Sequence, residues 1–353
     1  MNKDTFTLNG KETIFKPGQT ILDAARDAGV TIPTLCHLKG TTPTGACRVC
    51  LVEVSGARSL MASCSTPVTP GMVVETDNER ARRTRKLIVD LLLSSGHHNC
   101  VVCEANGDCR LQDLAYACGI TEVRFTEPDK FYPTETENPL IVRDFSRCIL
   151  CGRCVQACNE VVVNRAISYG YRGSSSKIVT GGDGSYNDSE CVFCGQCVEV
   201  CPVGALTEKK AKGMGRPWET QKIRTTCPYC GVGCQQLLHV KDGRIAKVTA
   251  VEGAEPNQGR LCVKGRFGYD FLTSEERLKI PLIRQENGEF REASWDEALD
   301  LVVSKFKGII EKDGPEAIGG VSCARSINED SYQMQKLFRS VFKTNNIDHC
   351  ART

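Results

Sequence analysis

The sequence has 353 residues, a near-balanced charge of +2 (Lys+Arg 45, Asp+Glu 43) and 41% hydrophobic residues. These values exclude a wholly disordered chain and argue against a dedicated nucleic-acid binder. No segment reaches the about 18 consecutive apolar residues of a membrane span, and Asp90 interrupts the apolar run 87–93. The first residues lack the apolar core of a signal peptide, so we expect a cytoplasmic protein. Its 22 cysteines should therefore stay reduced, for metal binding, catalysis or burial.

Residues 1–78 predict a small sheet domain. Residues 5–8 alternate like a strand, Asn9-Gly10 signals a hairpin turn with a return over 13–15, and Thr20 is a plausible N-cap for a short helix. Four cysteines follow with the spacing C-x10-C-x2-C-x13-C: Cys36, Cys47, Cys50 and Cys64. This order resembles a plant-type [2Fe–2S] ferredoxin of β-grasp shape, although the plant loop is shorter.

The spacing also matches the [2Fe–2S] domain that opens the large iron–sulfur subunit of three related groups of enzymes. These are NADH:quinone oxidoreductases, some [FeFe] hydrogenases and NAD-dependent formate dehydrogenases. The resemblance implies one [2Fe–2S] cluster on these four cysteines. A zinc ribbon is the alternative.

Residues 79–120 are expected to form a second domain that begins with a helix over 79–93. The apolar side of this helix is predicted from four residues: Leu87, Ile88, Leu91 and Leu92. Its start is crowded with basic residues, which are Arg80, Arg82, Arg83, Arg85 and Lys86. We interpret that run as a solvated face rather than as a polyanion site.

After this helix come His97, His98 and three cysteines with the spacing C-x2-C-x5-C: Cys100, Cys103 and Cys109. They resemble the [4Fe–4S] domain with one His and three Cys ligands found in the same families. In that domain the His lies four residues before the first Cys, where this chain has Gly96. His97 or His98 must replace it, and we favour His98. The alternative is an exposed His pair with Cys118 or water as the fourth ligand.

Residues 138–209, after a polar linker over 121–137, contain two runs of C-x2-C-x2-C-x3-C. In two-cluster ferredoxins the fourth Cys of each run reaches the neighbouring cluster. One [4Fe–4S] cluster is therefore assigned to Cys148, Cys151, Cys154 and Cys201. The other is assigned to Cys158, Cys191, Cys194 and Cys197. Structural zinc is the alternative. The insert between the runs contains 181–184 (GGDG), which we interpret as a surface loop and not as a nicotinamide site.

A basic linker over 207–226, expected to be solvated, leads to residues 220–276. There four cysteines with the spacing C-x2-C-x3-C-x27-C support one more cluster: Cys227, Cys230, Cys234 and Cys262. With the following Val263-Lys264-Gly265 they resemble the [4Fe–4S] domain that opens molybdenum or tungsten bis-pterin oxidoreductases. In that family a Lys two residues after the last Cys lies between cluster and pterin, which implies an electron-relay role for Lys264. A surface lysine is the alternative.

Residues 277–353 predict the incomplete start of an α/β molybdopterin domain. Ser294 with Glu297 and Ser326 with Glu329 suggest capping boxes for two helices, the second reaching Phe342. The first helix presents one apolar face: Leu299, Val302, Val303, Phe306, Ile309 and Ile310. Short strands are predicted within 316–323 and from Ile347.

The last residues, 345–353 (NNIDHCART), closely resemble formate dehydrogenases. In those enzymes the residue after Cys-Ala-Arg-x is the metal ligand, Cys or selenocysteine. We therefore expect a selenocysteine encoded by UGA directly after Thr353, so that the chain is the front of a longer subunit. Cys350 is not the expected ligand, and Cys118 and Cys323 are expected to be buried thiols.

The whole chain is thus predicted to be an α+β multidomain protein: the electron-transfer part of a formate dehydrogenase. The resemblance implies one [2Fe–2S] cluster, four [4Fe–4S] clusters and a molybdenum or tungsten bis-pterin guanine dinucleotide in the full-length protein. It implies partners that carry flavin and NAD(P), or a ferredoxin or hydrogenase subunit, with formate and CO2 as small molecules. No nucleic acid and no membrane span are expected. The alternatives are a self-contained, non-catalytic electron carrier, a hydrogenase arm and a large subunit like that of NADH:quinone oxidoreductase.

Overall fold

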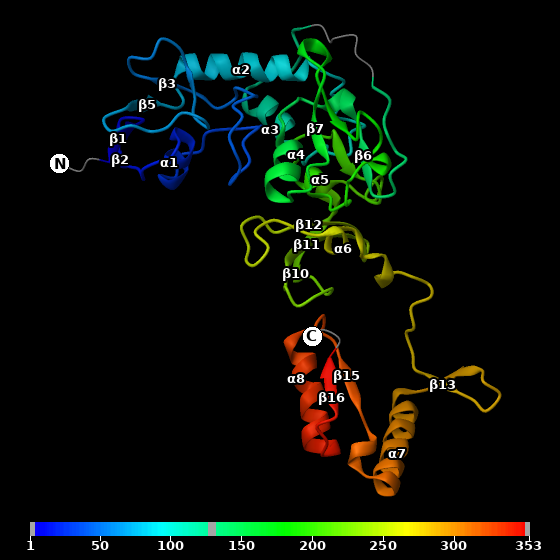
Figure 1. Cartoon of the computed structure of the whole chain (residues 1–353). Coiled ribbons are helices and arrows are strands. Elements are labelled where there is room, and N and C mark those ends of the chain that lie inside the picture. Colours follow the sequence, from blue (N-terminus) through cyan, green and yellow to red (C-terminus); the bar gives the residue numbers. More distant parts are fainter. Residues whose placement is uncertain (1–3, 126–131, 350–353) are drawn as a thin grey trace. The chain divides into compact units, whose positions relative to one another are not determined.

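The computed structural model describes residues 4–125 and 132–349, shown in Figure 1. The chain divides into two compact units. The first is residues 1–221 with 239–247, and the second is residues 222–238 with 248–353. Small sheets alternate with short helices along the chain, which confirms the predicted α+β class.

The first region is built on a five-stranded sheet in the order β2-β1-β5-β3-β4. Its strands are β1 (Thr5–Leu8), β2 (Lys11–Ile14), β3 (Leu51–Val54), β4 (Met61–Ala62) and β5 (Val73–Glu75). Thr20 caps helix α1 (Ile21–Asp27) as predicted, because its hydroxyl accepts a hydrogen bond from the Asp23 main-chain N–H at 3.2 Å. A buried apolar core includes Phe6, Ile21, Val52 and Val74.

Helix α2 (Glu79–Leu93) has the predicted bounds, and it packs on β3 and on α3 (Arg110–Ala117). The predicted apolar face is only partly right, since Leu87 and Leu91 are exposed. The buried positions of α2 are Ala81, Arg85, Val89 and Asp90. Two charged residues are buried there because each finds a polar partner. Asp90, for example, accepts a hydrogen bond from the Arg124 main-chain N–H at 3.2 Å.

The third region pairs strand β6 with β9 and strand β7 with β8, both antiparallel. Its strands are β6 (Ile141–Arg143), β7 (Ile167–Gly170), β8 (Lys177–Thr180) and β9 (Leu206–Glu208). Its helical turns are η1 (Phe145–Arg147), α4 (Arg153–Gln156), the π-helix η2 (Ala157–Val161), η3 (Gly173–Ser175), η4 (Tyr186–Asp188) and α5 (Gln196–Val200). The insert between the two cysteine runs is thus a hairpin with buried residues, and 181–184 form an exposed to half-buried turn, as predicted for a surface loop.

A three-stranded sheet in the order β10-β11-β12 follows the 3-10 turn η5 (Pro217–Glu219). Its strands are β10 (Gln221–Thr226), β11 (Gln235–Lys241) and β12 (Arg244–Ala250). Helix α6 (Val263–Phe267) and the turn η6 (Asp270–Leu272) complete this region. The turn between β10 and β11 carries three of the four cysteines predicted there.

The last region contains the hairpin β13 (Leu282–Arg284) and β14 (Phe290–Glu292), helix α7 (Trp295–Asp313) and turn η7 (Pro315–Ala317). Strand β15 (Gly320–Ser322) runs parallel to β16 (Ile347–His349), joined by α8 (Asn328–Lys336) and the π-helix η8 (Leu337–Phe342). Ser294 caps α7 as predicted, with the Glu297 N–H at 3.1 Å from its hydroxyl.

The second predicted capping box is wrong. The N-cap of α8 is Ile327, because the Ser326 hydroxyl instead donates to the Cys323 carbonyl at 2.7 Å. The π-helix still ends at Phe342, as predicted. Cys350 and Thr353 lie outside the described residues.

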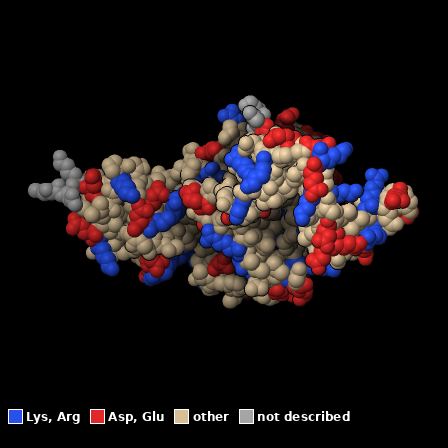
Figure 2. Space-filling view, turned by 90° about the horizontal axis from the view of Figure 1, so that it is seen from below, with Lys and Arg blue, Asp and Glu red and all other residues tan. Residues whose placement is uncertain are grey.

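Charged side chains of both signs are interspersed on the face shown in Figure 2. Among the described residues, no helix combines the length and apolar character needed to cross a bilayer.

Candidate iron–sulfur sites

The first cysteine group lies in the loops that connect α1 to β3 and β4 to β5. Cys36, Cys47, Cys50 and Cys64 are all buried. The Cys36 thiol contacts those of Cys47 and Cys64, and Cys64 also contacts Cys50. Hydrogen bonds from Cys47 and Cys64 lower the pKa of Cys36, and one from Cys64 lowers that of Cys50. The same hydrogen bonds raise the pKa of Cys47 and of Cys64. Four thiols gathered away from water fit the donor set of a [2Fe–2S] cluster.

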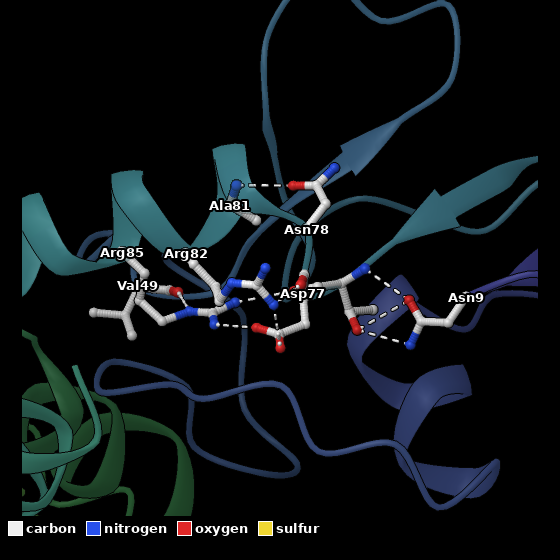
Figure 3. Close-up of polar contacts among 8 residues, drawn as sticks. Asn9, Val49, Asp77, Asn78, Ala81, Arg82 and Arg85 are labelled. Atoms are coloured by element: carbon white, nitrogen blue, oxygen red, sulfur yellow. Dashed lines mark hydrogen bonds and ion pairs between the residues drawn. The ribbon is translucent and has the colours of Figure 1, made fainter. Parts of the chain in front are cut away.

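Arg85 fixes the loop that carries two of these cysteines (Figure 3). Its guanidinium is buried and donates to the main-chain carbonyls of Val49 at 3.3 Å and Thr76 at 3.1 Å. It also contacts Asp77 at 3.3 Å. The prediction of a solvated basic face is therefore wrong for Arg85. This side chain donates hydrogen bonds to two main-chain carbonyls that lie outside the strands.

The second group brings together Cys100, Cys103 and Cys109, whose charges influence one another. Burial raises the pKa of Cys100, and it raises that of Cys109 to about 11. Cys103 also lies against Gly204, since a Cβ at Gly204 would be 2.4 Å from the Cys103 Sγ. A side chain at position 204 would therefore collide with the Cys103 sulfur, and glycine avoids this collision.

The two histidines differ in placement. His97 is exposed and donates its main-chain N–H to the Ser146 carbonyl at 2.8 Å. His98 is half-buried with a buried Nε2, and its carbonyl lies 3.6 Å from the Cys100 Sγ. A Cβ at Gly96 would be 2.2 Å from the Ser146 carbonyl oxygen, so this position accepts only glycine. These contacts do not test which histidine binds, and the choice of His98 stays a prediction.

Like Cys323, Cys118 is half-buried rather than buried as expected. It ends α3, is packed against the core, and is influenced by Arg85 and Lys86 rather than by another cysteine. The structure thus gives no support to Cys118 as a fourth ligand.

The linker that was expected to be solvated packs on the second group. Arg216 donates to the carbonyls of Cys103 and of Val101, the latter at 3.4 Å. The Trp218 ring covers Gly107, where a Cβ would be 2.7 Å from a ring carbon. Lys247 forms an ion pair with Asp108 at 3.0 Å. The prediction fails for Arg216 because carbonyls of the cysteine loop offer its guanidinium partners that water would otherwise supply.

The third group surrounds a cavity lined by the thiol-bearing residues Cys148, Cys151, Cys154 and Cys201. Burial raises the pKa of both Cys148 and Cys151 to about 12. Such thiols are neutral at pH 7 unless a metal cation compensates the thiolate charge. A cavity with four sulfurs fits a [4Fe–4S] cluster.

The fourth group joins Cys158 to Cys191, Cys194 and Cys197, whose charges influence one another. Burial raises the pKa of Cys197 to about 12. The Tyr186 hydroxyl lies 3.6 Å from the Cys197 Sγ. These four cysteines come from both runs, as in the predicted exchange of the fourth ligand.

The two ferredoxin runs share one loop conformation. Leu150 and Phe193 have positive φ values of 52° and 51°, and Gly152 and Gly195 have 76° and 73°. The Leu150 N–H donates to the Cys148 Sγ at 3.4 Å, and the Phe193 N–H donates to the Cys191 Sγ at 3.4 Å. These turns direct main-chain N–H groups at the cysteine sulfurs, and such donors stabilise thiolate ligands.

Thiols of three groups share one hydrophobic core. Cys36 and Cys47 pack in it with Cys151, and Cys109 borders it. The α4–η2 segment contacts the first cysteine loop directly, because the Thr42 N–H donates to Glu160 at 2.7 Å. The first three candidate cluster sites are therefore contiguous within the first unit.

The fifth group lies in the second unit. The Cys227 N–H donates to the Cys234 carbonyl at 2.8 Å, and the charges of Cys230 and Cys262 act on Cys227. Cys227 is buried, whereas Cys230 and Cys262 are exposed. Lys264 is exposed on α6, two residues after Cys262. Among the described residues, no three His, Cys, Asp or Glu side chains gather tightly enough to hold a single metal ion.

Comparison with known proteins places five family models along the chain. They are a 2Fe-2S iron–sulfur cluster binding domain (residues 3–79), the NADH-ubiquinone oxidoreductase-G iron–sulfur binding region (85–124), the ferredoxin-like domain of NADH-quinone oxidoreductase subunit 3 (138–207), the molybdopterin oxidoreductase Fe4S4 domain (220–274) and molybdopterin oxidoreductase (277–353). The chain therefore carries, in this order, domains like those of iron–sulfur and molybdopterin oxidoreductases.

Three curated relatives match nearly the whole chain. The chain is 40% identical to a Geobacter sulfurreducens NADPH-Fe(3+) oxidoreductase subunit alpha, over 99% of this chain and 40% of the relative. It is 39% identical to an NADH-quinone oxidoreductase subunit of Rhizobium meliloti (98% and 40%). It is 34% identical to a Staphylococcus aureus protein provisionally named a formate dehydrogenase (98% and 39%). The chain thus spans about 40% of the length of these relatives.

A solved structure also resembles this chain. The crystal structure of an NAD+-reducing [NiFe]-hydrogenase in the H2-reduced state matches with 36% identity and a TM-score of 0.55. The match covers 60% of this chain and 90% of the hydrogenase chain.

Two residues that the structure places at the candidate sites were not predicted from the sequence. Arg153 is buried, and its charge acts on Cys151 and Cys201 as well as on His37, the neighbour of Cys36. The sequence did offer one signal for Arg153, which is its position between Cys151 and Cys154. Tyr186 had none, because it lies in an insert without a motif.

Proposed function

We propose that this protein is part of an oxidoreductase and relays electrons between a site of formate oxidation and an NAD(P)-linked partner. The observation that carries the relay is the shared core, in which Cys36, Cys47 and Cys151 pack together with Cys109 at its border. Centres held there would lie next to one another, without a solvent gap. Short separations suit single-electron transfer through protein.

The proposed ligands are the five cysteine groups, with His98 completing the second. One [2Fe–2S] and four [4Fe–4S] clusters would supply one-electron acceptors and donors. The chain's own residues hold the thiols in buried loops and direct N–H groups at sulfur. We propose domains at residues 1–78, 79–120, 138–209, 220–276 and 277–353. Lys264 is proposed to lie between the fifth cluster and a bis-pterin cofactor of molybdenum or tungsten.

Formate as the substrate is supported by the sequence 345–353 (NNIDHCART), which resembles formate dehydrogenases, and by the name of the Staphylococcus aureus relative. Oxidation of formate to CO2 releases two electrons and one proton, and the two electrons would leave singly. The partner class is supported by the NAD+-reducing hydrogenase and by relatives named for NADH or NADPH. A cytoplasmic location belongs to the same proposal, and a selenocysteine after Thr353 stays a prediction.

A second candidate is an electron relay for NAD(P)H that does not act on formate. It is favoured by the higher identity of the NADPH-Fe(3+) oxidoreductase subunit alpha, 40% against 34%. In this case the molybdopterin-type domain would have another substrate or a structural role.

One experiment separates the two candidates. The full-length subunit with its partner is treated under argon with formate, NADH or NADPH, and cluster reduction is followed by EPR. Formate oxidation predicts that formate alone produces the EPR signals of reduced clusters. Reduction by NADH or NADPH with no response to formate would reject formate and retain the relay. Clusters that respond to none of the three would reject both candidates.

A further inference from the structure

The insert between the two ferredoxin runs places a tyrosine at the fourth cysteine group. Strands β7 and β8 pair in register from Ile167 with Thr180 to Gly170 with Lys177. The chain then turns through residues 181–184 and enters η4, which begins with Tyr186. Tyr186 is only 3% exposed, although its insert has many polar residues. Its burial needs a reason beyond loop formation, because a buried hydroxyl is costly without a partner.

The partner of the Tyr186 hydroxyl is sulfur. The hydroxyl lies 3.6 Å from the Sγ of Cys197, within hydrogen-bond distance for a sulfur acceptor. A thiolate bound to iron has no proton, so in the loaded protein the tyrosine must be the donor. Tyr186 also lines the cavity of the third cysteine group. It therefore lies between the two ferredoxin sites and forms its hydrogen bond to only one of them.

Arg143 holds the ring of Tyr186 in place. Its guanidinium carbon lies 4.5 Å from the centroid of the Tyr186 ring and 5.0 Å from that of Phe145. Arg143 is buried, pairs with Glu135, and donates to Thr180 Oγ1 at 2.8 Å and to the Gly184 carbonyl at 2.9 Å. Because both ends of the insert's turn are fixed by Arg143, the Tyr186 hydroxyl is directed at sulfur with little freedom.

A hydrogen bond to a cluster thiolate affects the two redox states differently. When the cluster gains one electron, negative charge on its sulfurs increases, and a donor interacts more strongly with the reduced state. Hydrogen bonds to sulfur are one of the means by which a protein sets cluster potential. Tyr186 keeps its proton in both states, so only the electron moves.

We propose that Tyr186 raises the reduction potential of the cluster held by Cys158, Cys191, Cys194 and Cys197 through its hydrogen bond to Cys197. The inference rests on the cluster assignment of the proposed function. Tyr186 is a tuning residue and is not a ligand. Since the third group receives no such bond from it, the two ferredoxin clusters differ in potential partly through this one hydroxyl.

The test is an EPR-monitored redox titration of the full-length, cluster-loaded protein carrying Tyr186→Phe. Phenylalanine keeps the ring against Arg143 and removes only the hydroxyl. The midpoint potential of one [4Fe–4S] cluster should fall by about 59 mV, which is a tenfold change in a one-electron equilibrium. The signal that moves should be the one lost in Cys191→Ser.

Tyr171→Phe is the matched control. Tyr171 belongs to the same insert, but it is exposed and its hydroxyl donates to Asp183 at 2.6 Å, not to sulfur. All potentials should remain unchanged in this variant. Unchanged potentials in a fully loaded Tyr186→Phe protein, or an equal shift in the control, would overturn the inference alone. If Cys191→Ser removes no [4Fe–4S] signal, the cluster assignment fails and the inference fails with it.

Discussion

The Nε of Arg85 donates a hydrogen bond to the main-chain carbonyl of Val49, 3.3 Å away, and so joins helix α2 to the first cysteine loop. Val49 lies in the segment between Cys47 and Cys50, and both Val49 and Arg85 are buried. A hydrogen bond from a charged donor contributes about 1.5–3 kcal/mol, and an orphaned buried carbonyl costs a similar amount. The first candidate cluster site therefore depends on a residue of the neighbouring region.

Arg85→Met should weaken this loop by about 1.5–3 kcal/mol, because the carbonyls of Val49 and Thr76 lose their donor. The expected result is a lower urea concentration at which the visible absorption of the [2Fe–2S] cluster disappears. Arg83→Met is the control, since Arg83 is exposed on the same helix. Equal midpoints for the two variants would show that the Arg85 contact does not stabilise the loop.

Local spacing explains what the sequence predicted correctly. The bounds of α2 follow from Asn78, whose side chain accepts the Ala81 N–H at 2.9 Å, and from local apolar periodicity. Thr20 likewise begins α1 through a bond three residues away. The cysteine runs place their thiols together because two intervening residues suffice for a turn around one centre.

Contacts between distant residues explain what the sequence did not predict. Arg85 is 36 residues from Val49, and Arg216 is 113 residues from Cys103. The run of basic residues in α2 gave the same signal for buried Arg85 as for exposed Arg83. Only tertiary packing decides which arginine finds carbonyls to bind.

Gly204→Ala should disrupt the second candidate cluster site. The new methyl group would lie 2.4 Å from the Cys103 Sγ, so either the sulfur or the 201–204 turn must shift. Such overpacking costs about 1–3 kcal/mol and displaces a ligand atom. We expect a specific loss of iron and of one [4Fe–4S] EPR signal, with the [2Fe–2S] signal retained.

Gly308→Ala is the control for this substitution, because nothing lies within 4 Å of its Cβ position in α7. It should leave iron content unchanged. A Gly204→Ala protein with the full iron content and all signals would contradict the close packing of Cys103 against residue 204.

His98→Ala should change the same EPR signal that Gly204→Ala removes, whereas His97→Ala should leave it intact. The reason is placement, since Nε2 of His98 is buried whereas His97 is exposed. Replacement of an imidazole by water or hydroxide shifts both the potential and the g-values of a cluster. The reverse pattern would make His97 the ligand. If neither variant changed the EPR signal, no histidine would be a ligand of this cluster.

Cys118 provides a test of thiol chemistry in the loaded protein. Burial raises the pKa of this thiol, an effect only partly opposed by the charges of Arg85 and Lys86. The thiolate is the reactive form, so alkylation by iodoacetamide should be slower than for a free cysteine below pH 9. Because the folded pKa is raised, the rate should continue to increase with pH where a free cysteine has already reached its plateau.

Mass spectrometry of peptides after timed alkylation measures this profile, with Cys118→Ser as the blank. Alkylation at Cys118 should leave every cluster signal intact, since the described thiols of the second group are Cys100, Cys103 and Cys109 and not Cys118. Bleaching of a [4Fe–4S] signal in step with Cys118 modification would instead make this thiol the fourth ligand. It would also require α3 to rearrange, because the Cys118 N–H donates to the Leu114 carbonyl at 2.9 Å and holds the thiol at the end of that helix.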